Sequence, residues 1–242
     1  MAQPTTNSNN LDIGFSETAK HEGTTDRPME FELLGLRWDL LPDVFAPFHS
    51  PSTEAYSRWL PYPEGSSLLE MGCGAGVTAV FGALNGCRHV TALDISPAAV
   101  ENARHNAARH GVVDRVRAME SDMFSALSPA DRFDVIFWNS NAVEAPEDFA
   151  YTRDIEWSIL DRGYVSHRTY FREGPQHLAE GGRLFLGFNS RGNRTLIERF
   201  AKEEGLRIKE INSASRVFED RTVEFRLLEL IKADSANTVS TA

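Results

Sequence analysis

Three glycines alternating with small residues directly after an apolar run constrain the fold of this chain more than any other feature. The stretch LLEMGCGAGVTA occupies residues 68–79, where Gly72, Gly74 and Gly76 follow the run that carries Glu70. Glycine lets the backbone turn tightly from a strand into a helix, and it lets the amide groups of the helix N-terminus approach a ligand. The sequence therefore predicts a strand–turn–helix unit with a ligand at the turn.

Short apolar runs and helical stretches alternate along most of the chain. Strands are expected near residues 67–71, 89–94, 115–120, 133–138, 183–188, 206–211 and 223–231, and helices near 77–85, 97–110, 164–179 and 193–204. This alternation is typical of a parallel sheet with helices on both faces. We therefore predict an α/β, doubly wound fold, in which ligands bind at the carboxyl ends of the strands.

Composition separates the ends of the chain from its middle. Residues 1–48 are expected to form an N-terminal extension, in which residues 11–34 suit a helical lid over the active site. Residues 49–233 are expected to form the main domain, and residues 234–242 a flexible tail. The formal charge of -10 argues against binding to nucleic acid or to an anionic membrane surface. No apolar run is long enough to span a bilayer, and the two cysteines fit a cytoplasmic location.

Several common kinds of site are not indicated by the motifs. A dinucleotide fingerprint that started at Gly72 would need glycine at position 77, where Val77 stands, and the Gly-Lys-Ser/Thr phosphate loop is absent. A Gly-x-Ser-x-Gly hydrolase elbow is absent too. His105 and His110 lie five residues apart on one predicted helix, which is poor spacing for a shared metal ion. We therefore expect no metal site.

The glycine loop, Asp94 at the end of the second predicted strand and Asp122 after the third together resemble the class I S-adenosylmethionine-dependent methyltransferases. The resemblance extends over residues 40–232 and includes HLAEGGRLFL at 177–186. It implies a mostly parallel seven-stranded Rossmann-like sheet with an antiparallel last strand, and S-adenosylmethionine as the cofactor. The residues that it implies for cofactor binding are Glu70, Gly72, Gly74, Gly76, Asp94, Ile95, Asp122, Met123 and Asn139.

The resemblance gives most of these residues a chemical role. Asp94 would accept hydrogen bonds from the ribose hydroxyls, since a carboxylate can accept from both hydroxyls of a diol. Asp122 would bind the adenine amine between the apolar walls of Ile95 and Met123. Glu70 would orient the glycine loop or hold the ammonium group of the methyl donor, and the loop amides would hold its carboxylate.

The acceptor side of the site departs from one branch of this family. Asn139 stands where many members carry Asn-Pro-Pro-Tyr, but Ser140 and Asn141 replace both prolines. This departure argues against nucleic acid or glutamine as the methyl acceptor. Asn139 and Ser140 are the candidate catalytic residues, because the Asn139 amide can hydrogen-bond a nucleophile near the sulfonium.

Aromatic residues around the predicted site suit a cationic sulfonium, because aromatic faces attract cations. The candidates for the sulfonium or substrate pocket are Phe45, Phe48, His49, Trp138, Tyr164 and Tyr170. The alternative for each of them is an ordinary place in the core. The insert at residues 142–163 is acidic and aromatic, and it is either a wall of the substrate pocket or a solvated connection.

These features predict an S-adenosylmethionine-dependent enzyme that methylates a small molecule, as in secondary metabolism, with no nucleic-acid or membrane partner. No general base is conspicuous in the sequence, which favours one alternative reaction. In it the amine of S-adenosylmethionine attacks its own side chain, which gives azetidine-2-carboxylate and methylthioadenosine. A protein that binds the cofactor without turnover is a third hypothesis.

Overall fold

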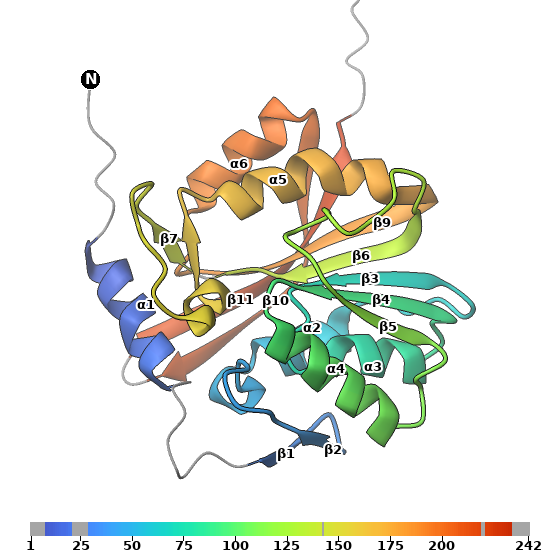
Figure 1. Cartoon of the computed structure of the whole chain (residues 1–242). Helices are drawn as coiled ribbons and strands as arrows, with labels where there is room; N and C mark the ends of the chain where they lie inside the picture. The colour runs from blue at the N-terminus through green and yellow to red at the C-terminus, as the bar shows by residue number, and fades with distance from the viewer. Residues whose placement is uncertain (1–7, 21–28, 142, 219–220, 234–242) are drawn as a thin grey trace, which may run out of the picture.

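A twisted seven-stranded sheet forms the centre of the computed structural model, which describes residues 8–20, 29–141, 143–218 and 221–233 (Figure 1). Its strand order is β10–β11–β9–β6–β3–β4–β5. The strands are β3 (Ser67–Met71), β4 (His89–Asp94), β5 (Val116–Glu120), β6 (Phe133–Asn139), β9 (Leu178–Asn189), β10 (Leu206–Phe218) and β11 (Arg221–Lys232). Only β11 runs antiparallel to its neighbours within this sheet. The predicted α/β, Rossmann-like sheet with an antiparallel last strand is therefore confirmed.

Helices cover both faces of this sheet, as Figure 1 shows. One face carries α2 (Ser52–Trp59), α3 (Val77–Leu84) and α4 (Pro97–Arg109), and the other carries α5 (Val165–Glu173) and α6 (Arg194–Glu203). Successive residues of β3 point to opposite faces, so Leu68 packs in one apolar cluster and Leu69 in the other. Because both faces of the sheet are covered by helices, a strand such as β3 has a mostly apolar sequence without the alternation of a half-exposed strand.

The segments before the first predicted strand form more structure than the sequence indicated. A hairpin of β1 (Glu30–Leu33) and β2 (Leu36–Asp39) turns at Leu34 and Gly35, which both have positive φ, of 58° and 77°. The single-turn helix η1 (Pro47–His49) then leads into α2. Among the described residues of the predicted lid at 11–34, the helix is α1 (Ser8–Lys20), and residues 30–33 form strand β1, so the prediction of a helix is wrong for residues 30–33. Residues 21–28 and the predicted tail at 234–242 lie outside the described residues.

The hairpin packs on the body of the fold rather than over the strand ends. Asn106 of α4 accepts a hydrogen bond from the Asp39 amide at 2.8 Å, and Asn102 accepts one from the Leu41 amide at 2.8 Å. Trp38 is fully buried in the cluster beneath α3 and α4. The hairpin is thus fixed to α4 by buried side chains.

The insert between β6 and α5 folds into a small layer of its own. Its elements are β7 (Val143–Ala145), the 3₁₀ helix η2 (Asp154–Ser158) and β8 (Leu160–Arg162), and β7 pairs with β8 in parallel. Helix α1 packs beside β7, and the Phe15 and Phe149 rings lie 6.0 Å apart. The chain before the main domain therefore covers the insert.

The predicted helix at 164–179 ends earlier than expected, at Glu173. Pro175 lies inside the short 3₁₀ turn η3 (Gly174–His177) that follows α5, and strand β9 begins at Leu178. Proline cannot donate a backbone hydrogen bond, so it does not continue an α-helix.

Across the described ranges, none of the helices combines the length and the apolar character that crossing a membrane requires.

Gly76 is required where α3 begins. It has a φ of 76°, and a Cβ atom there would lie 2.7 Å from Cα of Ala103 on α4. We expect Gly76→Ala to lower the free energy of unfolding by about 2–4 kcal/mol in urea denaturation, through backbone strain and overpacking. Gly111→Ala is the matched control, because Gly111 has a φ of 66° and no described atom lies within 4 Å of such a Cβ. It should cost only about 1 kcal/mol. Equal losses would contradict the close packing of α3 against α4.

Candidate active site

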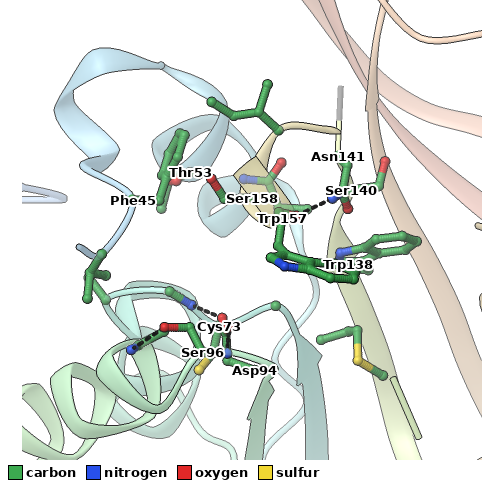
Figure 2. Close-up of a pocket in the computed structure, with 18 of the residues that line it drawn as sticks. Phe45, Thr53, Cys73, Asp94, Ser96, Trp138, Ser140, Asn141, Trp157 and Ser158 are labelled. Carbon is green, nitrogen blue, oxygen red and sulfur yellow. Dashed lines mark hydrogen bonds between the residues drawn. The ribbon is translucent and has the colours of Figure 1, made fainter. Parts of the chain in front are cut away.

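A cavity opens at the carboxyl ends of β3, β4 and β6, where the parallel strands of the sheet end together (Figure 2). The glycine loop and Asp94 form one wall, whereas Trp138 and Ser140 come from the end of β6. Figure 2 shows Phe45 and Thr53 on the side opposite Trp138 and Trp157. One cavity therefore contains both the glycine loop predicted to bind the cofactor and the residues at the end of β6 predicted to bind the methyl acceptor.

The glycine loop is tied to the second strand through Asp94. The Gly74 amide donates to Oδ2 of Asp94 at 2.8 Å, and the Ser96 amide donates to Oδ1 at 2.9 Å. Burial raises the pKa of Asp94, and these backbone hydrogen bonds oppose the rise. Because each carboxylate oxygen can accept more than one hydrogen bond, Asp94 keeps capacity for a diol.

The loop leaves its backbone open to a ligand at Gly74. Gly72 and Gly74 both have positive φ, of 61° and 52°, and no described atom lies within 4 Å of a Cβ placed on Gly74. A side chain at Gly74 would thus occupy the cavity itself. Gly76 is not among the residues that line the cavity and lies against Ala103, which gives it a packing role, and its contact with the cofactor stays a prediction.

Glu70 is a buried acid in the cavity wall. Its Oε2 atom has no hydrogen-bond partner among the residues that the structure describes. Burial and, to a smaller extent, the Asp94 charge raise the pKa of Glu70 to about 8, although hydrogen bonds from Thr78 and from the Ala79 amide lower it. An unpartnered acceptor in this position fits a cationic ligand. The site therefore fits S-adenosylmethionine, which carries an ammonium group, a sulfonium and a ribose diol.

Three polar residues follow one another at the end of β6. Asn139 donates through Nδ2 to the Ser52 hydroxyl at 3.2 Å. The Ser140 hydroxyl donates to the Gly187 carbonyl at 2.9 Å, so its proton is directed toward β9 rather than into the cavity. Asn141 donates to the Leu160 carbonyl at 3.1 Å and also to the Trp157 carbonyl. Each side chain is therefore held in one orientation.

Most of the predicted site residues line this one cavity. They are Phe45, His49, Glu70, Gly72, Gly74, Asp94, Ile95, Asp122, Met123, Trp138, Asn139 and Ser140. The structure brings them together from β3, β4, β6 and the segments that follow β5 and precede α2. Their individual roles stay predictions.

Three predicted aromatic residues do not line the cavity. Tyr170 is buried in the core and donates to the Phe185 carbonyl at 2.6 Å, and Tyr164 is stacked on His167 with ring centroids 4.1 Å apart. Phe48 is 37% exposed and lies outside the lining. The expected positions of these three in the pocket are wrong, because the two tyrosines pack in the core around α5, and Phe48 lies in η1 against Phe31. The ordinary core alternative holds for both tyrosines.

Other lining residues were not expected from the sequence. Ser52 and Thr53 come from the start of α2, and Trp157 and Ser158 come from the insert. The aromatic composition of the insert was a signal for Trp157, whereas nothing in the sequence marks the two α2 residues. Because Asp154, Ile155 and residues 157–159 of the insert contribute to the lining, that part of the insert is a wall of the cavity.

Acidic side chains outnumber basic ones around the cavity. Among the described residues, Asp43, Glu70, Asp94, Asp122 and Asp154 line it, and Arg191 is the guanidinium that does. Such a lining favours a cationic ligand over an anionic one. Nowhere in the described ranges do three metal-ligating side chains form a group that could hold a metal ion.

Residues 68–155 match the family model described as a methyltransferase domain. The release factor glutamine methyltransferase of Cereibacter sphaeroides is 31% identical over 170 residues, which are 67% of this chain and 60% of that protein. The ribosomal protein L11 methyltransferase of Dechloromonas aromatica is 40% identical over 91 residues, which are 37% of this chain and 29% of that protein. The chain thus spans less than two thirds of the length of either relative.

A solved structure with the same fold is the Thermus thermophilus 16S rRNA N2 G1207 methyltransferase, determined with AdoMet and guanosine. It has a TM-score of 0.58 and 20% sequence identity, and the alignment covers 85% of this chain and 50% of that chain. The domain match, the relatives and the shared fold support the class I S-adenosylmethionine-dependent methyltransferase superfamily for this chain. The predicted class of enzyme and its cofactor, S-adenosylmethionine, are confirmed.

The predicted acceptor class is wrong. The relatives are named for release factor and ribosomal protein L11, and the solved structure is named for 16S rRNA. These names overturn the expectation of a small-molecule acceptor and the exclusion of nucleic acid, and the cyclisation alternative is overturned with them. The net charge of the whole chain is an average over its surface, so it does not decide what one cavity binds.

Glu70 predicts a specific pH dependence of stability. The folded protein keeps this carboxyl protonated up to about pH 8, whereas the unfolded chain releases the proton near its ordinary pKa of 4.5. The unfolding free energy of the donor-free protein should therefore fall as the pH rises from about 5 to about 8. Glu70→Gln keeps the side chain neutral and should remove this part of the fall. Urea denaturation at several pH values compares the two proteins, and identical pH profiles would contradict the buried, protonated state.

Proposed function

We propose that the protein transfers the methyl group of S-adenosylmethionine to a nitrogen atom of a protein acceptor, with the side-chain amide of glutamine as the first candidate. The observation that carries this proposal is the orientation of Asn139 at the end of β6. Similarity to a release factor glutamine methyltransferase over 170 residues supports it. The sequence Asn139-Ser140-Asn141 would then be a divergent form of the Asn-Pro-Pro-Tyr motif.

The contact with Ser52 decides which part of Asn139 is offered to the acceptor. Because Nδ2 of Asn139 donates to the Ser52 hydroxyl, the carbonyl oxygen Oδ1 remains to accept a hydrogen bond. The Ser50 hydroxyl also donates to the Ser52 hydroxyl, at 3.0 Å, which fixes that hydroxyl in turn. Asn139 can therefore hold an N–H group of the acceptor in the amide plane, which leaves one face of the nitrogen open toward the methyl group.

The reaction requires little from the protein beyond orientation. S-Adenosylmethionine supplies an electrophilic methyl carbon, and the nitrogen–carbon bond forms as the carbon–sulfur bond breaks, with the electron pair left on sulfur and one nitrogen-bound proton released to water. Asn139 would orient the nitrogen, and the glycine loop and Asp94 would fix the donor. Glu70 is buried, and its unpartnered Oε2 atom would accept a hydrogen bond from the ammonium group of the donor.

The character of the cavity favours a protein acceptor over RNA. The carboxylates of Asp43 and Asp154 lie in the lining and would repel a phosphate backbone. A protein acceptor that works in translation would also fit the expected cytoplasmic location. The packing of α1 beside β7 supports the further proposal that the N-terminal extension acts as a lid on this side of the site.

The direct test offers candidate acceptors together with methyl-labelled S-adenosylmethionine. Purified bacterial release factor, ribosomal protein L11 and total RNA are incubated separately, and the label is located by mass spectrometry. Label on a glutamine of release factor is the expected result. Label on RNA only would replace the protein acceptor by a nucleic acid, and label on none of the three would overturn the proposal.

Asn139→Ala should lower the rate of methyl transfer to release factor about hundredfold, because the acceptor nitrogen loses its orienting hydrogen bond. The dissociation constant of S-adenosylhomocysteine, measured by calorimetry, should stay nearly unchanged. Asn85→Ala is the matched control, since Asn85 is exposed at the end of α3 and does not line the cavity. Unchanged turnover in Asn139→Ala would show that Asn139 does not act on the acceptor.

A further inference from the structure

We propose that Trp157, which the insert places in the cavity, is the platform on which the planar amide of the acceptor lies. This inference rests on the proposed function, since it names the residue that positions the acceptor group. Trp157 is half-buried and lines the cavity, and Figure 2 shows it on the same side as Trp138. No motif in the sequence marks this residue.

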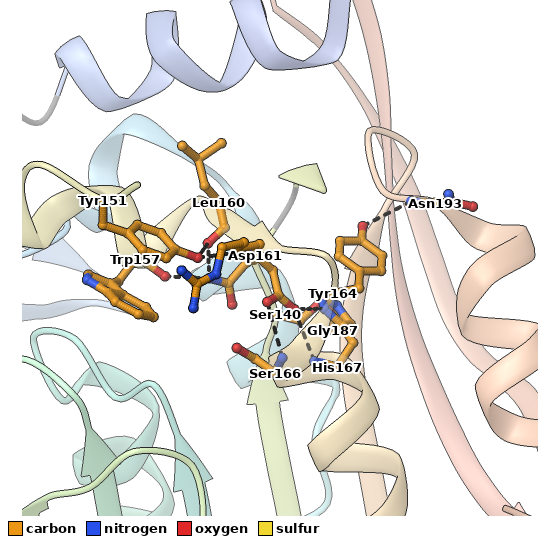
Figure 3. Close-up of polar contacts among 12 residues, drawn as sticks. Ser140, Tyr151, Trp157, Leu160, Asp161, Tyr164, Ser166, His167, Gly187 and Asn193 are labelled. Carbon is orange, nitrogen blue, oxygen red and sulfur yellow. Dashed lines mark hydrogen bonds and ion pairs between the residues drawn. The ribbon is translucent and has the colours of Figure 1, made fainter. Parts of the chain in front are cut away.

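The Tyr151 ring packs against one face of the Trp157 indole and holds it in place. The two rings stack with their centroids 3.7 Å apart and an angle of 15° between the planes. The Tyr151 hydroxyl donates to the Leu160 carbonyl at 3.2 Å and accepts from the Arg162 amide at 3.0 Å, as Figure 3 shows around Leu160. Since Tyr151 covers one face of the indole, the contact with the cavity comes from the rest of the ring.

The backbone of Trp157 is coupled to the candidate catalytic strand end. Asn141, two residues after Asn139, donates from one amide nitrogen to the carbonyls of Trp157 and Leu160. The turn that carries Trp157 is closed by Glu156, whose buried carboxylate accepts from the Thr152 amide at 2.7 Å and from the Thr152 hydroxyl at 3.0 Å. The position of the indole relative to Asn139 is therefore fixed before any acceptor binds.

This arrangement suits a planar, uncharged group. An indole face offers a flat apolar surface that removes water from one side of an amide without competing for its hydrogen bonds. Asn139 can at the same time accept from the amide N–H in the plane of the group. Stacking from one residue and an in-plane hydrogen bond from the other would fix both the tilt and the rotation of the acceptor, which sets the direction of its attack.

Nuclear magnetic resonance of the indole N–H groups tests this inference without any turnover. The chain has four tryptophans, Trp38, Trp59, Trp138 and Trp157, and the spectra of single Trp→Phe variants assign their signals. The protein saturated with S-adenosylhomocysteine is titrated with N-acetyl-L-glutaminamide. The Trp157 signal should shift while the signal of Trp59, which does not line the cavity, stays in place. A probe that leaves the Trp157 signal in place, or that shifts all four signals alike, would overturn the inference.

Kinetics on release factor provides the second readout. Trp157→Ala should lower kcat/KM for the acceptor about tenfold, Trp157→Phe should restore most of the loss, and Trp59→Phe should have no effect. The dissociation constant of S-adenosylmethionine should change less than about twofold in all three variants, since the indole serves the acceptor. A large loss of donor affinity in Trp157→Ala would assign the ring to the sulfonium and overturn the platform. If the wild-type protein methylates no protein, the proposed function fails, while the indole shift still decides the inference.

Discussion

The hydrogen bond from the Gly74 amide to the Asp94 carboxylate is the contact on which the site depends. It joins the turn after β3 to the end of β4 across 2.8 Å, and the second oxygen of Asp94 receives the Ser96 amide as α4 begins. One side chain thereby fixes a glycine loop, a strand end and a helix start relative to one another. The loop can then expose its backbone at Gly74, because its position is held by Asp94 rather than by side chains of its own.

Much of this fold can be predicted from the sequence, and so can the part of the site that lies at the strand ends, because parallel strands end at a common edge of the sheet. The apolar runs locate the strands, and Glu70, Asp94 and Asn139 then meet wherever β3, β4 and β6 end side by side. The same argument does not apply to helices and loops. Tyr170 could have faced a pocket or the core, and only the packing of α5 shows that it lies in the core.

The acceptor side was hard to predict because distant segments build it. Ser52 lies far from Asn139 in the sequence, yet its hydroxyl orients the Asn139 amide. Trp157 depends on the stacking of Tyr151 and on the hydrogen bonds of Asn141, and neither aromatic residue belongs to a recognisable motif. The acceptor class was misjudged for a related physical reason. A net charge of -10 describes the chain on average, whereas acceptor choice depends on a few groups in one cavity.

The central claim is that one cavity presents a methyl donor, held by the glycine loop and Asp94, to a nitrogen oriented by Asn139. A crystal structure of the protein with S-adenosylhomocysteine tests it most directly. We expect the ribose hydroxyls to bind Asp94, the amino-acid end to lie on the loop at Gly74, and the sulfur to face Asn139 and Trp157 across the cavity. A ligand bound elsewhere, or one whose sulfur points away from Asn139, would show that this cavity does not present the donor to Asn139.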